Sequence, residues 1–420
     1  MSEESIIVRG GNPLLGTVRI AGAKNSVLKL MAASLLAEGV TTIENAPLIS
    51  DVALMGDVLR KLGATVAFDG HRVTIDTSKA DSIEAPYEFM GRIRASIVVL
   101  GPLLGRFNRA RVAMPGGDQI GERKLDMHIQ GLEALGVKFA VDHGYINASA
   151  PQGLKGASVS LGFPSVGATE NLMLAAVKAC GTTTIDNAAR EPEIVDLANC
   201  LVCMGAHIEG AGTSVIEIEG VTALGPAQGY HTVGDRIEAG TFLVAGALCG
   251  GPLTLQGINP CHLDLPVAKL RSMGCTLETG DNSITISHTG PFQPVDIQTL
   301  PYPGFPTDLQ AQFMVLDAIA QGSSIITENV FEKRFVFTGE LARMGADIRI
   351  EGHRALINGV RKLSGAPVAS PDLRAGAALV LAGLVADDKT VVSGVEHIDR
   401  GYEGFVDKLR SLGANITREA

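Results

Sequence analysis

Hydrophobic and polar positions along the chain repeat with a period of about 70 residues. Each repeat has a helical pattern with one apolar face, then a glycine, then alternating positions typical of a strand. The glycines lie between 68 and 73 residues apart, at Gly63, Gly136, Gly205, Gly274, Gly345 and Gly413. Glycine is favoured directly after a helix because it adopts the left-handed conformation cheaply. Several of the following strands turn back as hairpins, as in residues 64–76 and 346–359.

A second helical pattern occurs once per repeat and is apolar nearly all round. Such helices are expected to be buried, with the amphipathic helices and the hairpins covering them. They occupy residues 26–39, 94–107, 170–181, 238–251, 308–322 and 374–388. A β-rich segment precedes the amphipathic helix in most repeats, and residues 109–117 fill this place less clearly. We predict an α/β protein in which three repeats per domain surround a core of helices. A solenoid is the alternative, although 70 residues is long for a common solenoid unit.

Composition indicates a soluble globular chain with room for two or more domains. Apolar residues make up 46% of its 420 residues and charged residues 19%. The longest apolar stretches, such as residues 375–386, are too short to span a membrane, and no secretion signal is visible. The CxxC pair Cys200 and Cys203 lies in a helical pattern, which favours buried structural thiols over a redox or metal site. We therefore expect a cytoplasmic protein without a metal and without a membrane partner.

The net charge of −10 argues against nucleic acid as a partner. An anionic substrate would require a local concentration of positive charge. Lys24 and Asn25 stand where an AGA turn enters an apolar helix, and a helix N-terminus with a lysine favours phosphate. The alternative is a solvated lysine in the first turn.

Arginines beside the loops and helix starts supply further positive charge. An arginine next to a nearly apolar helix must reach solvent or find an anion, because an unpaired buried charge is costly. Guanidinium groups match the geometry of carboxylates and phosphates. The candidates are Arg94, Arg123, Arg334, Arg374 and Arg400. Structural ion pairing is the alternative, for instance of Arg400 with Asp399 or Glu403.

Three other segments carry candidate chemistry. Residues 115–121 place three glycines and a proline around Asp118, as in a flexible lid or a plain surface turn. Asp308 directly precedes an apolar helix, where it could act as a base or as the N-cap. Residues 165–167 also precede an apolar helix, so their backbone groups could contact a diphosphate.

Eight segments, in order over nearly the whole chain, resemble the UDP-N-acetylglucosamine enolpyruvyl transferase family. They are AGAKN (21–25), PGGDQIGERKLDMH (115–128), FPSVGATEN (163–171), NAAREPEIVDLAN (187–199), GFPTDLQAQF (304–313), FEKRF (331–335), SGAPVASPDLRAG (364–376) and HIDRGYE (397–403). The resemblance implies two inside-out α/β barrel-like domains, each of three repeated units with buried helices and outer sheets. One domain would hold residues 24–230 with the lid 115–121, and the other 1–23 plus 231–420, with the active site in the cleft between them.

The resemblance also implies an activity. The enolpyruvyl group of phosphoenolpyruvate would pass to the 3-hydroxyl of UDP-N-acetylglucosamine, with release of phosphate, as the first committed step of peptidoglycan synthesis. No cofactor and no metal would be needed. Two alternatives stay open: the sister reaction on shikimate 3-phosphate, and a catalytically weak paralogue that binds a UDP-sugar.

Residue roles carried over from the family fall into three groups. The catalytic residues would be Asp118 as general acid, Asp308 as base and Lys24. Phosphoenolpyruvate would be bound by Lys24, Asn25, Arg123, Arg374 and Arg400. The UDP-sugar would contact Arg94, Arg123, Lys124, Leu125, Asp126, Met127, Phe163, Ser165, Val166, Asp308 and Val330. Arg334 would support the cleft.

Two residues depart from the family pattern. Asp118 replaces the usual loop cysteine, and Lys124 replaces the usual proline after Arg123. In this family the antibiotic fosfomycin, an epoxide, alkylates the loop cysteine. Because a carboxylate is a much weaker nucleophile than a thiolate, we expect this protein to be insensitive to fosfomycin.

Overall fold

The protein is described from a computed structural model that covers residues 4–90, 94–114, 121 and 124–419. The chain forms two compact units. Of the described residues, the first unit comprises 22–90, 94–114 and 124–233, and the second comprises 4–21, 121 and 234–419. Each unit has its own hydrophobic core.

The first unit alternates helices and short strands. Its helices are α1 (Lys24–Ala33), η1 (Ser34–Leu36), α2 (Ser50–Lys61), α3 (Tyr87–Met90), η2 (Arg94–Val99), α4 (Leu100–Phe107), α5 (Asp126–Ala134), α6 (Val166–Ala176) and α7 (Pro192–Cys203). Its strands are β3 (Val40–Glu44), β4 (Thr65–Asp69), β5 (Arg72–Asp76), β6 (Glu84–Ala85), β7 (Arg109–Ala113), β8 (Lys138–Asp142), β9 (Tyr145–Ser149), β10 (Ser158–Ser160), β11 (Thr182–Asp186), β12 (His207–Glu209), β13 (Val215–Glu219) and β14 (Tyr230–His231).

The second unit repeats this plan. Its helices are α8 (Arg236–Cys249), η3 (Pro260–Leu263), α9 (Asp264–Ser272), η4 (Thr307–Leu309), α10 (Gln310–Ala318), α11 (Thr338–Arg343), α12 (Leu373–Val385), α13 (Val395–Asp399) and α14 (Phe405–Ser411). Its strands are β1 (Ser5–Arg9), β2 (Gly16–Arg19), β15 (Leu253–Gln256), β16 (Thr276–Thr279), β17 (Ser283–Ser287), β18 (Ile297–Gln298), β19 (Ser323–Thr327), β20 (Asp347–Glu351), β21 (Arg354–Asn358), β22 (Pro367–Ala369), β23 (Lys389–Ser393) and β24 (Asn415–Glu419).

Each repeat contributes one four-stranded sheet. The strand orders are β14-β3-β5-β4, β6-β7-β9-β8 and β10-β11-β13-β12 in the first unit, and β2-β15-β17-β16, β18-β19-β21-β20 and β22-β23-β1-β24 in the second. Each sheet has one parallel edge pair and two antiparallel pairs, as in β10 with β11 and then β11 with β13. The six repeat glycines all have positive φ, between 90° and 111°, which confirms their predicted place at the helix ends.

Three sheets are completed by a distant part of the chain. β14 pairs in parallel with β3, so the end of the first unit closes the sheet of its first repeat. β2 pairs in parallel with β15. β1 lies antiparallel between β23 and β24, in the place that the second hairpin strand takes in the other sheets. The N-terminal strands therefore complete two sheets of the second unit.

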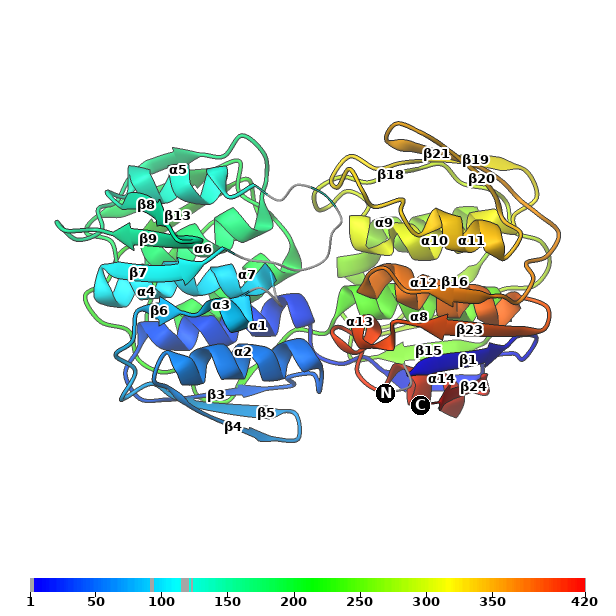
Figure 1. Cartoon of the computed structure of the whole chain (residues 1–420), viewed down its shortest axis with the longest axis horizontal. Helices are drawn as coiled ribbons and strands as arrows, with labels where there is room; N and C mark the ends of the chain where they lie inside the picture. The colour runs from blue at the N-terminus through cyan, green and yellow to red at the C-terminus, as the bar shows by residue number, and fades with distance from the viewer. Residues whose placement is uncertain (1–3, 91–93, 115–120, 122–123, 420) are drawn as a thin grey trace. The chain divides into compact units, whose positions relative to one another are not determined.

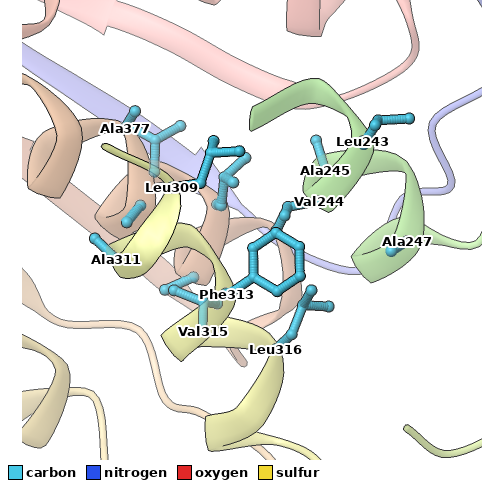
Figure 2. Packing of buried hydrophobic residues seen from close by; sticks show 14 of the residues in the cluster. Leu243, Val244, Ala245, Ala247, Leu309, Ala311, Phe313, Val315, Leu316 and Ala377 are labelled. Atoms are coloured by element: carbon cyan, nitrogen blue, oxygen red, sulfur yellow. The ribbon is translucent and has the colours of Figure 1, made fainter. Parts of the chain in front are cut away.

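The predicted apolar helices form the cores. In the second unit α8, α10 and α12 pack together inside the strands (Figure 1). Figure 2 shows Val244 of α8 beside the ring of Phe313 of α10. Gly240 of α8 permits this packing, because a Cβ there would lie 2.4 Å from a methyl carbon of Leu309. In the first unit α1, α4 and α6 are buried in the same way.

The prediction of buried cysteines is only partly correct. Cys200 and Cys275 are buried, whereas Cys180, Cys203 and Cys261 are exposed. Cys203 is the last residue of α7, where the helix leaves the core, and it is exposed. Within the described residues, no helix combines the length and apolar character required to cross a bilayer.

Asp317 is an ionisable residue buried in the core of the second unit. Its burial makes the stability of the protein depend on pH. Its side chain accepts a hydrogen bond from the Val295 N–H at 3.1 Å, and burial raises its pKa from 3.8 to about 7. The folded protein therefore holds this proton more tightly than the unfolded chain, and the stability contribution of Asp317 falls as pH rises from about 4 to about 7. Asp317→Asn keeps an acceptor but carries no charge, so we expect it to gain stability relative to the native protein over this range.

Chemical denaturation between pH 4 and pH 9 tests this expectation. The stability difference between Asp317→Asn and the native protein should change by on the order of 3 kcal/mol up to pH 7 and then stay level. A difference that does not vary with pH would show that folding does not raise the pKa of the Asp317 carboxyl group.

Candidate functional site

Lys24 is the first residue of α1 and is buried. Its Nζ lies 2.8 Å from Asp51 Oδ2, and its side chain is 8% exposed. The turn before it requires Gly22, since a Cβ there would lie 1.7 Å from the carbonyl oxygen of Asn45. Ala23 is extended and donates its N–H to Val233 O, which fixes where the helix begins. The alternative of a solvated lysine is therefore wrong, and Lys24 places a buried cation at a helix N-terminus, where an anion is favoured.

The starts of α5 and α6 lie together in the first unit. His128 of α5 packs against Gly167 of α6, where a Cβ would lie 3.2 Å from the imidazole ring. His128 Nδ1 also lies 3.0 Å from Nδ2 of Asn171 on α6. The structure thus brings together two segments that the sequence predicts to contact the UDP-sugar. The segment at the start of α5 contains Lys124, Leu125, Asp126 and Met127, and the segment at the start of α6 contains Phe163, Ser165 and Val166.

These residues differ in exposure and local role. Ser165 is the N-cap of α6 and accepts a hydrogen bond from the Ala168 N–H at 3.4 Å. Val166, the first residue of the helix, is half-buried. Phe163 is 39% exposed, and Lys124 and Asp126 are also exposed. Leu125 and Met127 pack into the core and hold the start of α5. The exposed side chains beside a helix N-terminus form a surface on which a charged ligand could be bound.

In the second unit, Asp308 lies between two buried arginines. Its Oδ1 accepts a hydrogen bond from Arg334 Nη2 at 2.8 Å, and its Oδ2 lies 3.2 Å from both Nε and Nη2 of Arg374. Asp308 lies inside η4, and neither η4 nor α10 has a side-chain cap bond, so the N-cap alternative is wrong. The physical reason is that two guanidinium groups bind the carboxylate more strongly than a free N–H would.

Arg374 is the most unusual cation among the described residues of the second unit. It is 2% exposed, and within the described residues its Nη1 is buried without a hydrogen-bond partner. Burial lowers its pKa, but the nearby Tyr402 and Asp308 outweigh that effect and the pKa is raised. Asp308 pairs with the other side of the guanidinium, so Nη1 remains as a buried donor at which an oxygen of an anionic ligand could be bound.

A polar network that the sequence did not reveal lies beside Arg374. Tyr402 is fully buried, with its ring centroid 5.3 Å from the guanidinium carbon of Arg374. Its hydroxyl lies 3.0 Å from Thr241 Oγ1 and accepts from Gln312 Nε2 at 3.3 Å. These three residues come from separate helices or loops, so the network fixes the position of Arg374. A buried tyrosine beside an arginine has no short sequence signal.

Glu328 organises the loop that carries Val330. Its Oε1 accepts from the N–H groups of Val330 and Phe331, at 2.8 and 3.1 Å, and its Oε2 accepts from Thr307 Oγ1 at 2.9 Å. Since Thr307 begins η4, Glu328 ties Val330 to the turn that holds Asp308. This residue was also missed in the sequence.

Arg400 directly follows α13 and is half-buried. Asp399, one of its two suggested partners, pairs with Arg418 at 2.6 Å. Asp118 and Arg123 lie outside the described residues, as does the segment 115–120, and for Arg94 only the backbone at the start of η2 is described. Among the described residues, no group of three His, Cys, Asp or Glu side chains could hold a metal ion.

Comparison with known proteins agrees with this arrangement. The model of the EPSP synthase (3-phosphoshikimate 1-carboxyvinyltransferase) family matches residues 8–409. UDP-N-acetylglucosamine 1-carboxyvinyltransferases from Corynebacterium jeikeium and Mycobacterium tuberculosis are 53% and 52% identical to the chain, over 99% of it and 99% of each relative. The crystal structure of the enolpyruvyl transferase NikO from Streptomyces tendae, 28% identical, superimposes with a TM-score of 0.90 over 99% of both chains. The chain belongs to the EPSP synthase family, and within it to the group of the UDP-N-acetylglucosamine 1-carboxyvinyltransferases.

Proposed function

We propose that this protein transfers the enolpyruvyl group of phosphoenolpyruvate to the 3-hydroxyl of UDP-N-acetylglucosamine and releases phosphate. The relatives that match at full length carry this activity in their names. The geometric observation that supports the proposal most is a carboxylate, Asp308, held beside the buried Arg374, whose Nη1 has no partner among the described residues. Such a site places a proton acceptor next to a position for an anion. We also propose that the reaction belongs to peptidoglycan synthesis in the cytoplasm.

The proposed roles follow the charges of the substrates. Phosphoenolpyruvate carries a phosphate and a carboxylate, and we assign it to Lys24 and Asn25 at the start of α1 and to Arg374 and Arg400 of the second unit. Arg123 is the fifth proposed ligand. The UDP-sugar is assigned to the starts of η2, α5 and α6, with Asp308 and Val330. Helix N-termini favour the diphosphate because their N–H groups have no partner within the helix.

The reaction consists of an addition and an elimination. The sugar 3-hydroxyl adds to C2 of phosphoenolpyruvate while a proton is added to C3, and the tetrahedral intermediate then loses phosphate and the C3 proton. Asp308 accepts the proton of the hydroxyl, directly or through Lys24, and Asp118 is the proposed acid for C3. The arginines and Lys24 stabilise the negative charge on the phosphate and carboxylate groups during both steps.

One assay tests the proposed function. Purified protein is incubated with phosphoenolpyruvate and either UDP-N-acetylglucosamine or shikimate 3-phosphate, and released inorganic phosphate is measured. We expect phosphate only with the UDP-sugar. Release with shikimate 3-phosphate would assign the sister reaction, and binding of the UDP-sugar without release would indicate a non-catalytic paralogue.

The role of Arg400 gives a prediction about substrate discrimination. Arg400→Ala should weaken phosphoenolpyruvate binding by about 2 kcal/mol, roughly 30-fold, and leave UDP-sugar binding nearly unchanged. This loss of binding free energy is small for the removal of a charged partner, because Arg400 is only half-buried. Calorimetric titration with each substrate measures this, with the exposed Arg343→Ala as a charge-matched control. Equal losses for both substrates would show that Arg400 is structural.

A further inference from the structure

Two of the helices expected to be apolar carry a buried ion pair. Lys29 of α1 and Glu170 of α6 are 8% and 2% exposed, and Lys29 Nζ lies 3.2 Å from Glu170 Oε1. Lys29 Nζ also donates a hydrogen bond to the carbonyl oxygen of Asn25 at 2.5 Å. This pair takes no part in the chemistry proposed above, and the sequence patterns did not single it out.

The burial of this ion pair costs free energy, because both charged groups lose their contact with water. The pKa of Glu170 is raised to about 7, mainly by burial; Lys29 lowers it, and the charges of Glu193 and Glu191 at the start of the neighbouring α7 add to the rise. Replacing a buried ion pair by well-packed apolar residues is often neutral or stabilising. Most of the other buried side chains of the two helices are apolar, and buried polar ones such as Ser26 and Asn171 have hydrogen-bond partners of their own. Stability alone therefore gives little reason for a lysine and a glutamate at these positions.

The position of the pair indicates what it connects. Lys29 lies little more than one turn after Lys24 and Asn25, and it holds the Asn25 carbonyl directly. Glu170 lies about one turn after Ser165 and Val166. The pair thus joins the helix start assigned to phosphoenolpyruvate to the helix start assigned to the UDP-sugar, within one unit.

We propose that Lys29 and Glu170 are positioning residues that couple the two substrate subsites of the first unit. This inference rests on the proposed function. When the UDP-sugar binds at the start of α6, the Glu170–Lys29–Asn25 connection restrains the start of α1 in the arrangement that binds phosphoenolpyruvate. Because coupling between two ligands is reciprocal, each substrate then tightens the binding of the other by the same factor.

The experiment measures this coupling factor without turnover. Phospholactate carries the phosphate and carboxylate of phosphoenolpyruvate but has no C2–C3 double bond, so addition to it cannot occur. Its dissociation constant is measured by calorimetry with and without saturating UDP-N-acetylglucosamine. In the native protein we expect the UDP-sugar to lower the dissociation constant of phospholactate at least about fivefold, which is the lower end of typical coupling factors.

The informative variant is the double substitution Lys29→Met with Glu170→Leu. It removes both charges together, so it should fold with a melting temperature close to that of the native protein. We expect its coupling factor to fall below about twofold, with KM for phosphoenolpyruvate raised more than kcat is lowered. Lys408→Met with Glu238→Gln is the matched control: it removes both charges of another buried pair, in the second unit, keeps an acceptor for the Ala21 N–H, and should retain native coupling.

The outcomes separate this inference from the proposed function. A folded double variant with the native coupling factor would overturn the positioning role while leaving the transfer activity in place. A native protein in which the UDP-sugar does not affect phospholactate binding would overturn it as well. Failure of the native protein to release phosphate, by contrast, would count against the proposed function itself.

Discussion

Arg374→Met is expected to abolish most phosphoenolpyruvate binding while the protein stays folded. Arg374 is 2% exposed and its Nη1 has no partner among the described residues, so an incoming carboxylate or phosphate would gain a charge-assisted hydrogen bond at a buried site. Loss of such an interaction costs on the order of 3 to 4 kcal/mol in kcat/KM. Folding should be spared, because Asp308 keeps its 2.8 Å ion pair with Arg334 and methionine fills a similar volume.

Arg334→Met is the matched control for this prediction. Arg334 is also buried and contacts the same carboxylate, but on its other oxygen. Its loss should disturb the orientation of Asp308 and lower kcat more than phosphoenolpyruvate affinity. Steady-state kinetics and thermal unfolding of the two variants test the distinction. If Arg374→Met bound phosphoenolpyruvate like the native enzyme, the unpartnered nitrogen would have no role in substrate binding.

The repeated architecture could be predicted from the sequence because its signals are local. A glycine that must adopt positive φ, such as Gly63, marks a helix end wherever it occurs. A helix with apolar residues on all sides, such as α12, must be buried in any fold. Six copies of both signals reinforce one another along the chain. The hydrophobic pattern is therefore sufficient to infer the α/β class and the helices of the two cores.

The closure of the sheets could not be inferred in the same way. The pairing of β1 with β23 and β24 joins residues that are far apart in the chain, since Ile7 pairs with Val391, 384 positions away, and with Thr417, 410 positions away. No local pattern specifies which strand completes an edge, since any short β-rich segment could do so. Tertiary contacts decide the partner.

In the candidate site, too, local features could be predicted from the sequence and long-range contacts could not. Asp308 was found by its motif, but its alternative as an N-cap could be rejected only from the positions of Arg334 and Arg374 on its two oxygens. Lys29 was hidden in an apolar pattern, because one buried lysine hardly alters the average hydrophobicity of a helix. Glu170, its partner, comes from another repeat. Long-range ion pairs of this kind have no signature in sequence spacing.

Asp118 provides the prediction with the largest expected effect on turnover. This residue lies outside the described part of the chain, so the prediction rests on its chemistry and on the family loop in which it replaces a cysteine. The proposed acid must deliver a proton to C3 of phosphoenolpyruvate. Asp118→Asn keeps the size of the side chain but has no acidic proton, so kcat should fall by roughly 10² to 10⁴ while UDP-sugar affinity is retained. Full activity of Asp118→Asn would exclude Asp118 as the acid.

Asp118→Cys tests the same residue by a gain of reactivity, whereas Asp118→Asn tests it by a loss of activity. A thiol can also donate a proton, so this variant should retain some activity. A thiolate attacks an epoxide far faster than a carboxylate does, so the variant should also become sensitive to fosfomycin, with a mass increase on the peptide containing residue 118. The native protein is its own control, because it already exposes Cys180, Cys203 and Cys261. If exposure of a thiol were enough for alkylation, these three would be modified in the native protein as well. We expect instead that fosfomycin leaves the native enzyme active and modifies only the new cysteine. Covalent inactivation of the native enzyme by fosfomycin would contradict the proposed role of the Asp118 loop.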